Sequence, residues 1–261
     1  MAKPLVSDAL WAAIEPLLPA PKPRRFRFPG RKPIDDRKAL TGILFVLKTG
    51  IPWADLPAEM GCGCGMSCWR RLHAWQQAGV WSQLYQFLLE HLDDTDKIDW
   101  SPSIARSPEP SEGWRAAAKT LRIGPSRRQT ARLTDANGVP LAAESTAANV
   151  PEVKRLLPLL DQCGPLDEEG QPTRLPSEVY GDRAYDSEPH REELRGRGVD
   201  PKLAKRGTEH GSGLGVHRWV AERPFSWLHG FRKLRFVTEK TKEMQLAFLN
   251  LALSLICLRY L

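Results

Sequence analysis

The stretch SEVYGDRAYDS, residues 177–187, decides the fold that this sequence predicts. Residues 178–180 form a short candidate strand, and Asp182 follows where such a strand leaves a sheet. Because α/β folds place catalytic and metal-binding carboxylates at strand ends, Asp182 is a candidate for that role. Aspartate is also common in turns, so capping the loop is the alternative role. A helix is expected at residues 188–197, which makes the surrounding domain α/β.

Two further segments support a sheet with helices around it. LTDANGVPLAAEST, residues 133–146, carries an Asn137-Gly138 pair between two alternating segments, which is the strongest short signal for a β-hairpin. Residues 150–163 have the apolar spacing of an amphipathic helix, and residues 216–261 predict two more helices. Near the start of that last region, Arg218 and Glu222 are four residues apart and share one helical face. An ordinary surface ion pair is the alternative interpretation of that pair.

The first 95 residues predict a helical domain. Ser7 or Asp8 can cap a first helix, and Asp35 or Asp36 can cap a second one that Gly50 closes. A glycine-rich turn at residues 61–65 precedes a third helix, with Ser67 as its expected cap.

The third helix has a candidate DNA-binding face. Trp69, Leu72 and Trp75 form its expected buried stripe, and Arg70 and Arg71 point away from that stripe. A short turn followed by a helix with outward arginines is typical of a helix-turn-helix that enters the major groove. A helical bundle with solvated arginines is the alternative.

A basic arm, KPRRFRFPGRKP at residues 22–33, lies between the first two expected helices. It interleaves six cations with two phenylalanines and is broken by prolines, so neither helix nor sheet is expected there. The cations are Lys22, Arg24, Arg25, Arg27, Arg31 and Lys32. With a net charge of +7, the chain favours polyanionic partners, because neutralised phosphates release their counterions.

The composition also limits the compartment and excludes a membrane protein. The chain has 261 residues and five cysteines, an odd count that does not suggest a disulfide framework. Neither a signal peptide nor an apolar run long enough to span a bilayer is present. We therefore expect a protein of the reducing cytoplasm that is not associated with a membrane.

Several stretches in this order resemble the insertion-sequence transposases of group five, within the acidic-triad (Asp-Asp-Glu) transposase superfamily. The resemblance rests on residues 56–81, 133–143, 156–161, 179–187, 205–215 and 218–235. It implies a helix-turn-helix-like domain at residues 1–95 and a ribonuclease-H-like mixed-sheet catalytic domain at residues 96–261. The expected partners are double-stranded DNA, both the terminal inverted repeats and the target, and a second copy of the chain in a homodimer.

The resemblance also implies the site residues. Asp182 corresponds to the second catalytic aspartate and Glu222 to the catalytic glutamate, and both would ligate metal. Arg218 matches the family signature around Glu222, whereas Gly215 replaces an expected tyrosine and His229 an expected lysine or arginine. His229, Arg232 and Lys233 join Arg218 as expected DNA contacts. In an intact family member, three carboxylates hold two Mg²⁺ or Mn²⁺ ions for DNA strand cleavage and strand transfer.

The first aspartate of the triad is missing. The family expects a strand soon after Asp99 and Trp100 with a pattern near Val-Val-Asp-Ser, but residues 101–132 carry four prolines and seven cations. We expect this stretch to be irregular and its central strand to be disrupted. Permitted codons for residues 102–104 encode Val-Asp-Ser after a two-base shift, so our hypothesis is a frameshift near Pro102 that is compensated before Leu133.

Two functions are open. The chain is an active transposase, or it is a DNA-binding remnant that occupies the element ends without cutting, and the missing aspartate leads us to expect that this copy is inactive. Asp99 and Asp135 are the nearest remaining carboxylates. We do not expect either to substitute, because Asp99 precedes the strand and Asp135 belongs to the hairpin turn.

Overall fold

The computed structural model describes residues 4–21, 26–27, 32–106, 128–147, 150–205, 207, 223, 226–235, 239 and 241–261. By its internal contacts the chain forms two compact units. The helical unit comprises Met1–Tyr85 and Leu228–Leu258, and the sheet unit comprises Gln86–Trp227 and Arg259–Leu261. This grouping differs from the division expected at residue 95, because the last long helix belongs with the N-terminal helices.

The helical unit begins where the sequence predicts. Ser7 caps α1 (Asp8–Ile14) by accepting a hydrogen bond from the Leu10 amide, and the 3₁₀ helix η1 (Glu15–Leu17) follows. Asp35 caps α2 (Asp36–Thr49) through the Lys38 amide, and Gly50 ends it with a left-handed φ of 73°. The other helices of this unit are α3 (Gly65–Gln77), α9 (Arg232–Arg235) and α10 (Lys242–Cys257), whereas α4 (Val80–Asp94) begins in it and continues past Tyr85 into the residues of the sheet unit.

Three expectations about α3 are wrong. Its cap residue is Cys64, not Ser67, and its buried positions are Gly65, Cys68, Leu72 and Trp75. Trp69 is only partly buried and stacks on His73. The connection from α2 is also not a short turn, since it contains the 3₁₀ helices η2 (Trp53–Asp55) and η3 (Ala58–Met60). A helix-turn-helix has a turn of about three or four residues, so the pair α2 and α3 departs from that motif.

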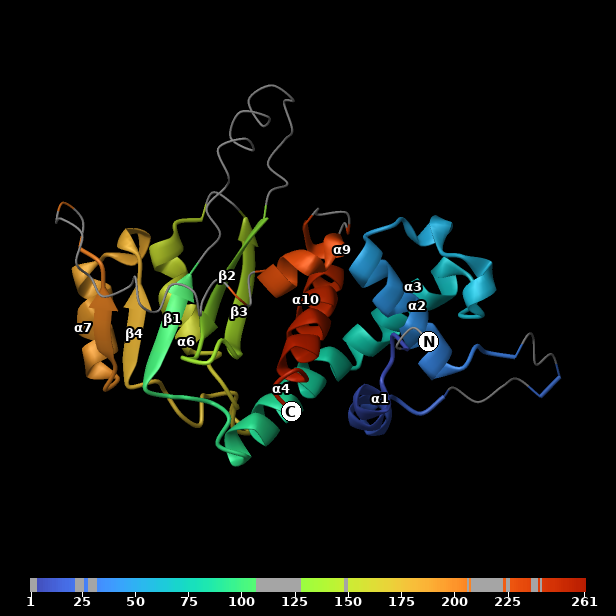
Figure 1. Cartoon of the computed structure of the whole chain (residues 1–261), viewed down its shortest axis with the longest axis horizontal. Coiled ribbons are helices and arrows are strands. Elements are labelled where there is room, and N and C mark those ends of the chain that lie inside the picture. Colours follow the sequence, from blue (N-terminus) through green and yellow to red (C-terminus); the bar gives the residue numbers. More distant parts are fainter. Residues whose placement is uncertain are drawn as a thin grey trace, which may run out of the picture. The chain divides into compact units, whose positions relative to one another are not determined.

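The sheet unit is built on five strands in the order β3-β2-β1-β4-β5, as Figure 1 shows for four of them. They are β1 (Pro102–Arg106), β2 (Arg128–Thr134), β3 (Pro140–Ala147), β4 (Glu178–Gly181) and β5 (Asp200–Leu203). β1 is antiparallel to β2 and parallel to β4, which is parallel to β5. The sheet is therefore mixed, as expected for a ribonuclease-H-like domain.

The expectation of a disrupted first strand is wrong for residues 102–106, because β1 is the central strand of the sheet. Pro102 occupies its first position, where proline is tolerated, and the other three prolines of the stretch lie beyond Arg106. Ser103, Ile104 and Ala105 are buried, so small and apolar side chains fill the interior positions. Residues 128–132 are also not irregular, since they open β2.

The connections of the sheet unit place Asp182. The predicted hairpin joins β2 and β3 through Gly138, which has a φ of 89°. Residues 150–163 form a 3₁₀ turn η4 (Glu152–Arg155) and a short α6 (Leu156–Leu160) that packs on β2 and β3. After β4 come a 3₁₀ turn η5 (Arg183–Tyr185) and α7 (Glu188–Gly196), which packs beside β5. Asp182 therefore lies between β4 and η5, at the strand exit that the sequence predicted.

Gly65 gives a test of the helical unit. A Cβ on Gly65 would lie 1.7 Å from the carbonyl oxygen of Trp53, which is backbone and cannot rotate away. We expect Gly65→Ala to lower the free energy of unfolding by about 3 kcal/mol or more, measured by denaturant melts. Gly196→Ala is the control, because nothing lies within 4 Å of a Cβ at that position. Equal stability of the two variants would contradict the close approach.

Candidate functional site

The candidate site lies at the ends of β1 and β4, around Asp182. Asp182 is half-buried, and its carboxylate accepts a hydrogen bond from the Ala184 amide at 2.8 Å. It is thus both the exit carboxylate and the cap of η5. The two roles that the sequence left open for this residue coexist, and the capping bond leaves its second carboxylate oxygen for another ligand.

The loop after Asp182 is fixed by a buried arginine. Arg191 on α7 has a side chain that is only 5% exposed, and it contacts Asp186 at 2.7 Å. The same guanidinium donates to the carbonyl oxygen of Leu203 at the end of β5, at 2.9 Å. Arg191 therefore ties the loop, α7 and β5 together. Asp186 is the partner of Arg191, and Ser187 is the N-cap residue of α7.

The sheet register determines what stands beside Asp182. Ala105 of β1 pairs with Gly181 of β4, so positions 106 and 182 follow at the same end of two parallel strands. On the other side of β1, Arg106 pairs with Arg132 of β2. The frame-shifted Val-Asp-Ser would fall at residues 102–104, which are Pro102, Ser103 and Ile104, so β1 (PSIAR) supplies no carboxylate beside β4.

The residues described at this edge do not fit a pair of divalent cations. They supply one carboxylate at position 182, whereas positions 106 and 132 are arginines. Within the described ranges, no cluster of three His, Cys, Asp or Glu side chains is arranged to hold a metal ion. Glu222 and Arg218 lie outside the described residues. The expected approach of Glu222 to Asp182 therefore stays a prediction.

Asp99 and Asp135, the aspartates nearest to β1 in the sequence, use their carboxylates in local hydrogen bonds and not at the sheet edge around Asp182. Asp135 is fully buried, and its carboxylate accepts hydrogen bonds from the amides of Asp99, Asn137 and Val139 at 2.6–2.9 Å. The Asp99 carboxylate is bound by the amide and hydroxyl of Ser101. Both carboxylates thus serve local turns, which agrees with the expectation that neither replaces the missing aspartate.

The described cations of the helical unit that we expected to bind DNA differ in their exposure and in their ion pairs. Arg70 on α3 is exposed, whereas Arg71 is partly buried and contacts Asp36 of α2 at 3.2 Å. In the basic arm, Arg27 and Lys32 are exposed. Arg24, Arg25 and Arg31 lie outside the described residues. Arg70 is therefore the α3 cation that is best placed for a contact with nucleic acid.

Lys233 does not suit a contact with DNA. It is 6% exposed, and its ammonium lies 2.9 Å from Glu239. The same Glu239 accepts a hydrogen bond from the Trp53 indole, and the ammonium lies 5.9 Å from the ring centres of Trp53 and Phe248. The expected phosphate contact is corrected to a buried ion pair. His229 and Arg232 nearby are exposed.

Comparison with known proteins places the chain in a family. The family described as "Transposase DDE domain" matches residues 98–257, and "Putative transposase of IS4/5 family" matches residues 6–85. The chain belongs to the DDE transposases. This confirms the resemblance and the fold class, and it places the candidate site within the domain from which the family takes its name.

Two relatives from Burkholderia cepacia are similar to this chain. One is described as "Insertion element IS402 uncharacterized 16.2 kDa protein", with 54% identity over 132 residues, covering 42% of this chain and 90% of the relative. The other is described as "Putative transposase for insertion sequence element IS402", with 55% identity over 126 residues, covering 48% of this chain and 60% of the relative.

The described helices include none that is both long and apolar enough to cross a membrane.

Asp135 provides a pH test of the sheet unit. Burial raises the pKa of the Asp135 carboxyl from 3.8 to about 6, although the amide hydrogen bonds oppose that rise. The folded state therefore holds the proton more tightly, so this group stabilises the fold below pH 4 and loses that contribution as pH rises through 6. At about 1.4 kcal/mol per pKa unit, the loss is roughly 3 kcal/mol.

We expect Asp135→Asn to abolish this part of the pH dependence in denaturant melts between pH 4 and 7. Asp167→Asn is the matched control, because Asp167 accepts amide hydrogen bonds from Glu169 and Gln171 in an exposed turn. The control should keep the wild-type slope of unfolding free energy against pH. Identical slopes for wild type and Asp135→Asn would refute the assignment.

Proposed function

We propose that this chain is an insertion-sequence transposase that binds the terminal inverted repeats of its element as a homodimer but does not cleave or join DNA. The observation that supports the loss of chemistry is that β1, the parallel neighbour of the strand that leads to Asp182, contains no carboxylate. The family assignment supports DNA as the substrate. The site of action is then the nucleoid in the bacterial cytoplasm.

The chemistry of the family explains why the loss of one carboxylate would remove activity. Transposases with an Asp-Asp-Glu triad use divalent metal ions, which an intact member would hold as two Mg²⁺ or Mn²⁺ ions between three carboxylates. Mg²⁺ requires hard oxygen ligands, and a guanidinium supplies none. A strand β1 without a carboxylate therefore lacks one of the three anionic ligands. Glu222 is the remaining carboxylate that we assign to this site.

DNA binding rests on different residues. The exposed Arg70 lies on the face of α3 opposite its buried stripe, and Arg27 and Lys32 belong to the exposed part of the basic arm. His229 and Arg232 extend the cationic set on the same unit. We assign phosphate or base contacts to these residues, together with Arg24, Arg25, Arg31, Arg71 and Arg218. Lys233 is left out because its charge is paired and buried.

The loss of chemistry is tested on a supercoiled plasmid that carries the element's own inverted repeats. We expect no cleavage or strand transfer by the wild-type chain with Mg²⁺ or Mn²⁺, and no further decrease in Asp182→Asn. An active enzyme would instead lose nearly all its activity in that variant. Strand transfer well above background by the unmodified chain would overturn the proposal. Sequencing the coding DNA should also show the Val-Asp-Ser motif out of frame.

A variant at position 106, which follows the register pair Ala105 and Gly181, tests whether a carboxylate beside Asp182 creates a metal site. Arg106→Asp should gain Mn²⁺ binding, seen as a rise in melting temperature of roughly 5 °C at saturating metal, because a ligand that binds only the folded state stabilises it. Arg106→Asn is the matched control, since it removes the cation without supplying a carboxylate. A rise in both variants, or in neither, would mean that position 106 does not complete a metal site.

The salt dependence of DNA binding tests the basic arm. Each phosphate contact contributes roughly 0.9 to the slope of log affinity against log salt, so neutralising six cations should lower the slope by up to about 5. The control is Arg195→Gln with Lys202→Gln, whose side chains pair with Glu188 and Asp200 on the sheet unit. An unchanged slope in the arm variant would remove the arm from the interface.

A further inference from the structure

The turn that leads into α3 carries three cysteines, and two of them form a buried pair. Cys62 and Cys68 are buried, and the Cys68 thiol donates a hydrogen bond to the carbonyl oxygen of Cys62 at 3.2 Å. A Cβ on Gly42 of α2 would lie 2.7 Å from the Cys68 sulfur and 3.1 Å from the Cys62 sulfur. The two sulfurs are therefore at most 5.8 Å apart, which is the sum of these distances. New side-chain rotamers and a small shift of the turn would bring them to the disulfide length of about 2 Å.

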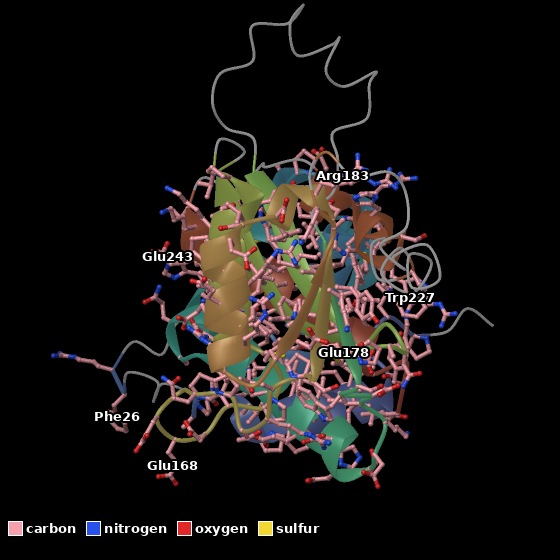
Figure 2. All side chains as sticks on the ribbon, turned by 90° about the vertical axis from the view of Figure 1, so that its left-hand side faces the viewer. Phe26, Glu168, Glu178, Arg183, Trp227 and Glu243 are labelled. Atoms are coloured by element: carbon pink, nitrogen blue, oxygen red, sulfur yellow. The ribbon has the colours of Figure 1, made fainter. Side chains whose placement is uncertain are left out.

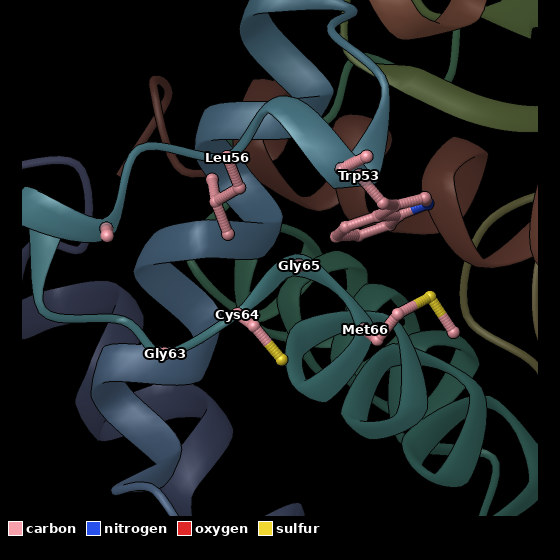
Figure 3. Close-up of a pocket in the computed structure, with 8 residues that line it drawn as sticks. Trp53, Leu56, Gly63, Cys64, Gly65 and Met66 are labelled. Atoms are coloured by element: carbon pink, nitrogen blue, oxygen red, sulfur yellow. The ribbon is translucent and has the colours of Figure 1, made fainter.

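The third cysteine of the turn, Cys64, is exposed and reactive. Figure 3 shows it between Gly63 and Gly65, at the start of α3. Its sulfur lies 3.2 Å from the Ser67 hydroxyl, and hydrogen bonding with Ser67 lowers the pKa of the Cys64 thiol. The positive end of the helix dipole also favours the thiolate, which is the nucleophilic form. The structure describes all five cysteines of the chain, and Cys64 is the exposed one.

An apolar hollow beside Cys64 admits a small reactant. Its volume is about 340 Å³, and Cys64, Trp53 and Met66 are among the residues that line it (Figure 3). Asp55 and Glu59 are exposed and adjoin lining residues in the chain, so their charges disfavour anionic reactants. A small uncharged organic disulfide suits the size, the polarity and the charge of this surface.

The buried pair is shielded from direct attack. Burial raises the pKa of the Cys68 thiol to about 12, and the adjacent Cys62 thiol adds to that rise. Cys68 therefore holds its proton and is a poor nucleophile toward reactants in solvent. Cys64 is two residues from Cys62, and its carbonyl oxygen accepts a hydrogen bond from the Cys68 amide at 3.2 Å. An oxidised Cys64 thus has both buried cysteines as neighbours in one turn.

We propose that Cys64 is a thiol-exchange site for small organic disulfides and passes the oxidation on to Cys62 and Cys68, which end as a disulfide beneath the turn. This inference assigns a modification site to the start of α3 and does not rest on the proposed function. Both experiments below are done without DNA, so their failure would leave the DNA-binding proposal standing. The site would make the turn before α3 responsive to oxidants.

The oxidation proceeds by three thiol–disulfide exchanges. The Cys64 thiolate attacks one sulfur of the small disulfide, whose S–S bond breaks and releases one small thiolate. The Cys62 sulfur then attacks the Cys64 sulfur and releases the second small thiolate. Finally, the Cys68 sulfur attacks the Cys62 sulfur and regenerates the Cys64 thiolate. The protons of Cys62 and Cys68 pass to the released thiolates, so the chain gives up two electrons and the small disulfide is reduced to two thiols.

Peptide mapping after oxidation with 2-hydroxyethyl disulfide tests the end product. Cyanogen bromide cleaves after Met60 and Met66, so residues 61–66 form a fragment that contains Cys62 and Cys64 but not Cys68. After the free thiols are alkylated, we expect this fragment to stay bound through Cys62 to the fragment that begins at Ser67, with Cys64 alkylated. An end product with the small thiol on Cys64, a 62–64 disulfide, or full alkylation of all three cysteines would overturn the proposal.

Variants test the route through Cys64. Cys64→Ser should slow formation of the 62–68 disulfide at least about tenfold, and Cys68→Ala should stop the reaction at the 62–64 disulfide. Glu168→Cys in the Cys64→Ser background is the matched control, because Glu168 is exposed in a turn of the sheet unit and its side chain points outward in Figure 2. This new exposed thiol should take up the small thiol without restoring the rate.

Three outcomes would contradict the relay. They are an unchanged rate in Cys64→Ser, a rate restored by the thiol at position 168, and a different product in Cys68→Ala.

Discussion

The parallel pairing of β1 with β4 is the constraint on which the candidate site depends. Side chains alternate between the faces of a strand, so a slip of one residue would carry position 106 to the opposite face and away from Asp182. The same register is maintained at the residues that precede the two strands, where the hydroxyl and amide of Ser177 donate hydrogen bonds to the carbonyls of Ser101 and Trp100. With this register fixed, β1 determines which residues stand beside the end of β4 that leads to Asp182.

The scaffold around Asp182 does not need a metal ion to hold its shape. The Asp182 carboxylate is positioned by the Ala184 amide, and the following loop is held by the contacts of Arg191 with Asp186 and the Leu203 carbonyl. Of the two expected metal ligands, Asp182 and Glu222, Asp182 takes part in these interactions through one carboxylate oxygen. The rest of the loop is held by contacts of Arg191 that involve no expected metal ligand.

Local patterns predicted local structure well. The caps Ser7 and Asp35, the hairpin at Gly138 and the strand exit at Asp182 each depend on residues close in sequence. The failures involve distant partners: Pro102 is acceptable only because it opens a strand whose neighbours are β2 and β4, and Lys233 is buried only because Glu239 and Trp53 meet it. The α3 stripe was misassigned because Gly42 leaves room for the Cys68 sulfur, which no helical periodicity reveals. The family resemblance supplied Glu222, which no local pattern distinguishes from a surface ion pair.

The helical unit includes residues 228–258, which follow the sheet unit in sequence. Its stability therefore depends on the chain continuing past the sheet unit. Lys233 and Phe248 surround Trp53, with Glu239 accepting the indole hydrogen bond, so α9 and α10 help to hold the segment that leads into α3. A chain that ended within residues 107–132 would lack these partners and would leave Trp53 and the apolar face of α2 exposed to water. Because the sequence follows the family's pattern again from Leu133 onward, these partners of Trp53 are present. The absence of a carboxylate from β1 is therefore compatible with an intact helical unit, because the chain continues in the family's sequence pattern to α10.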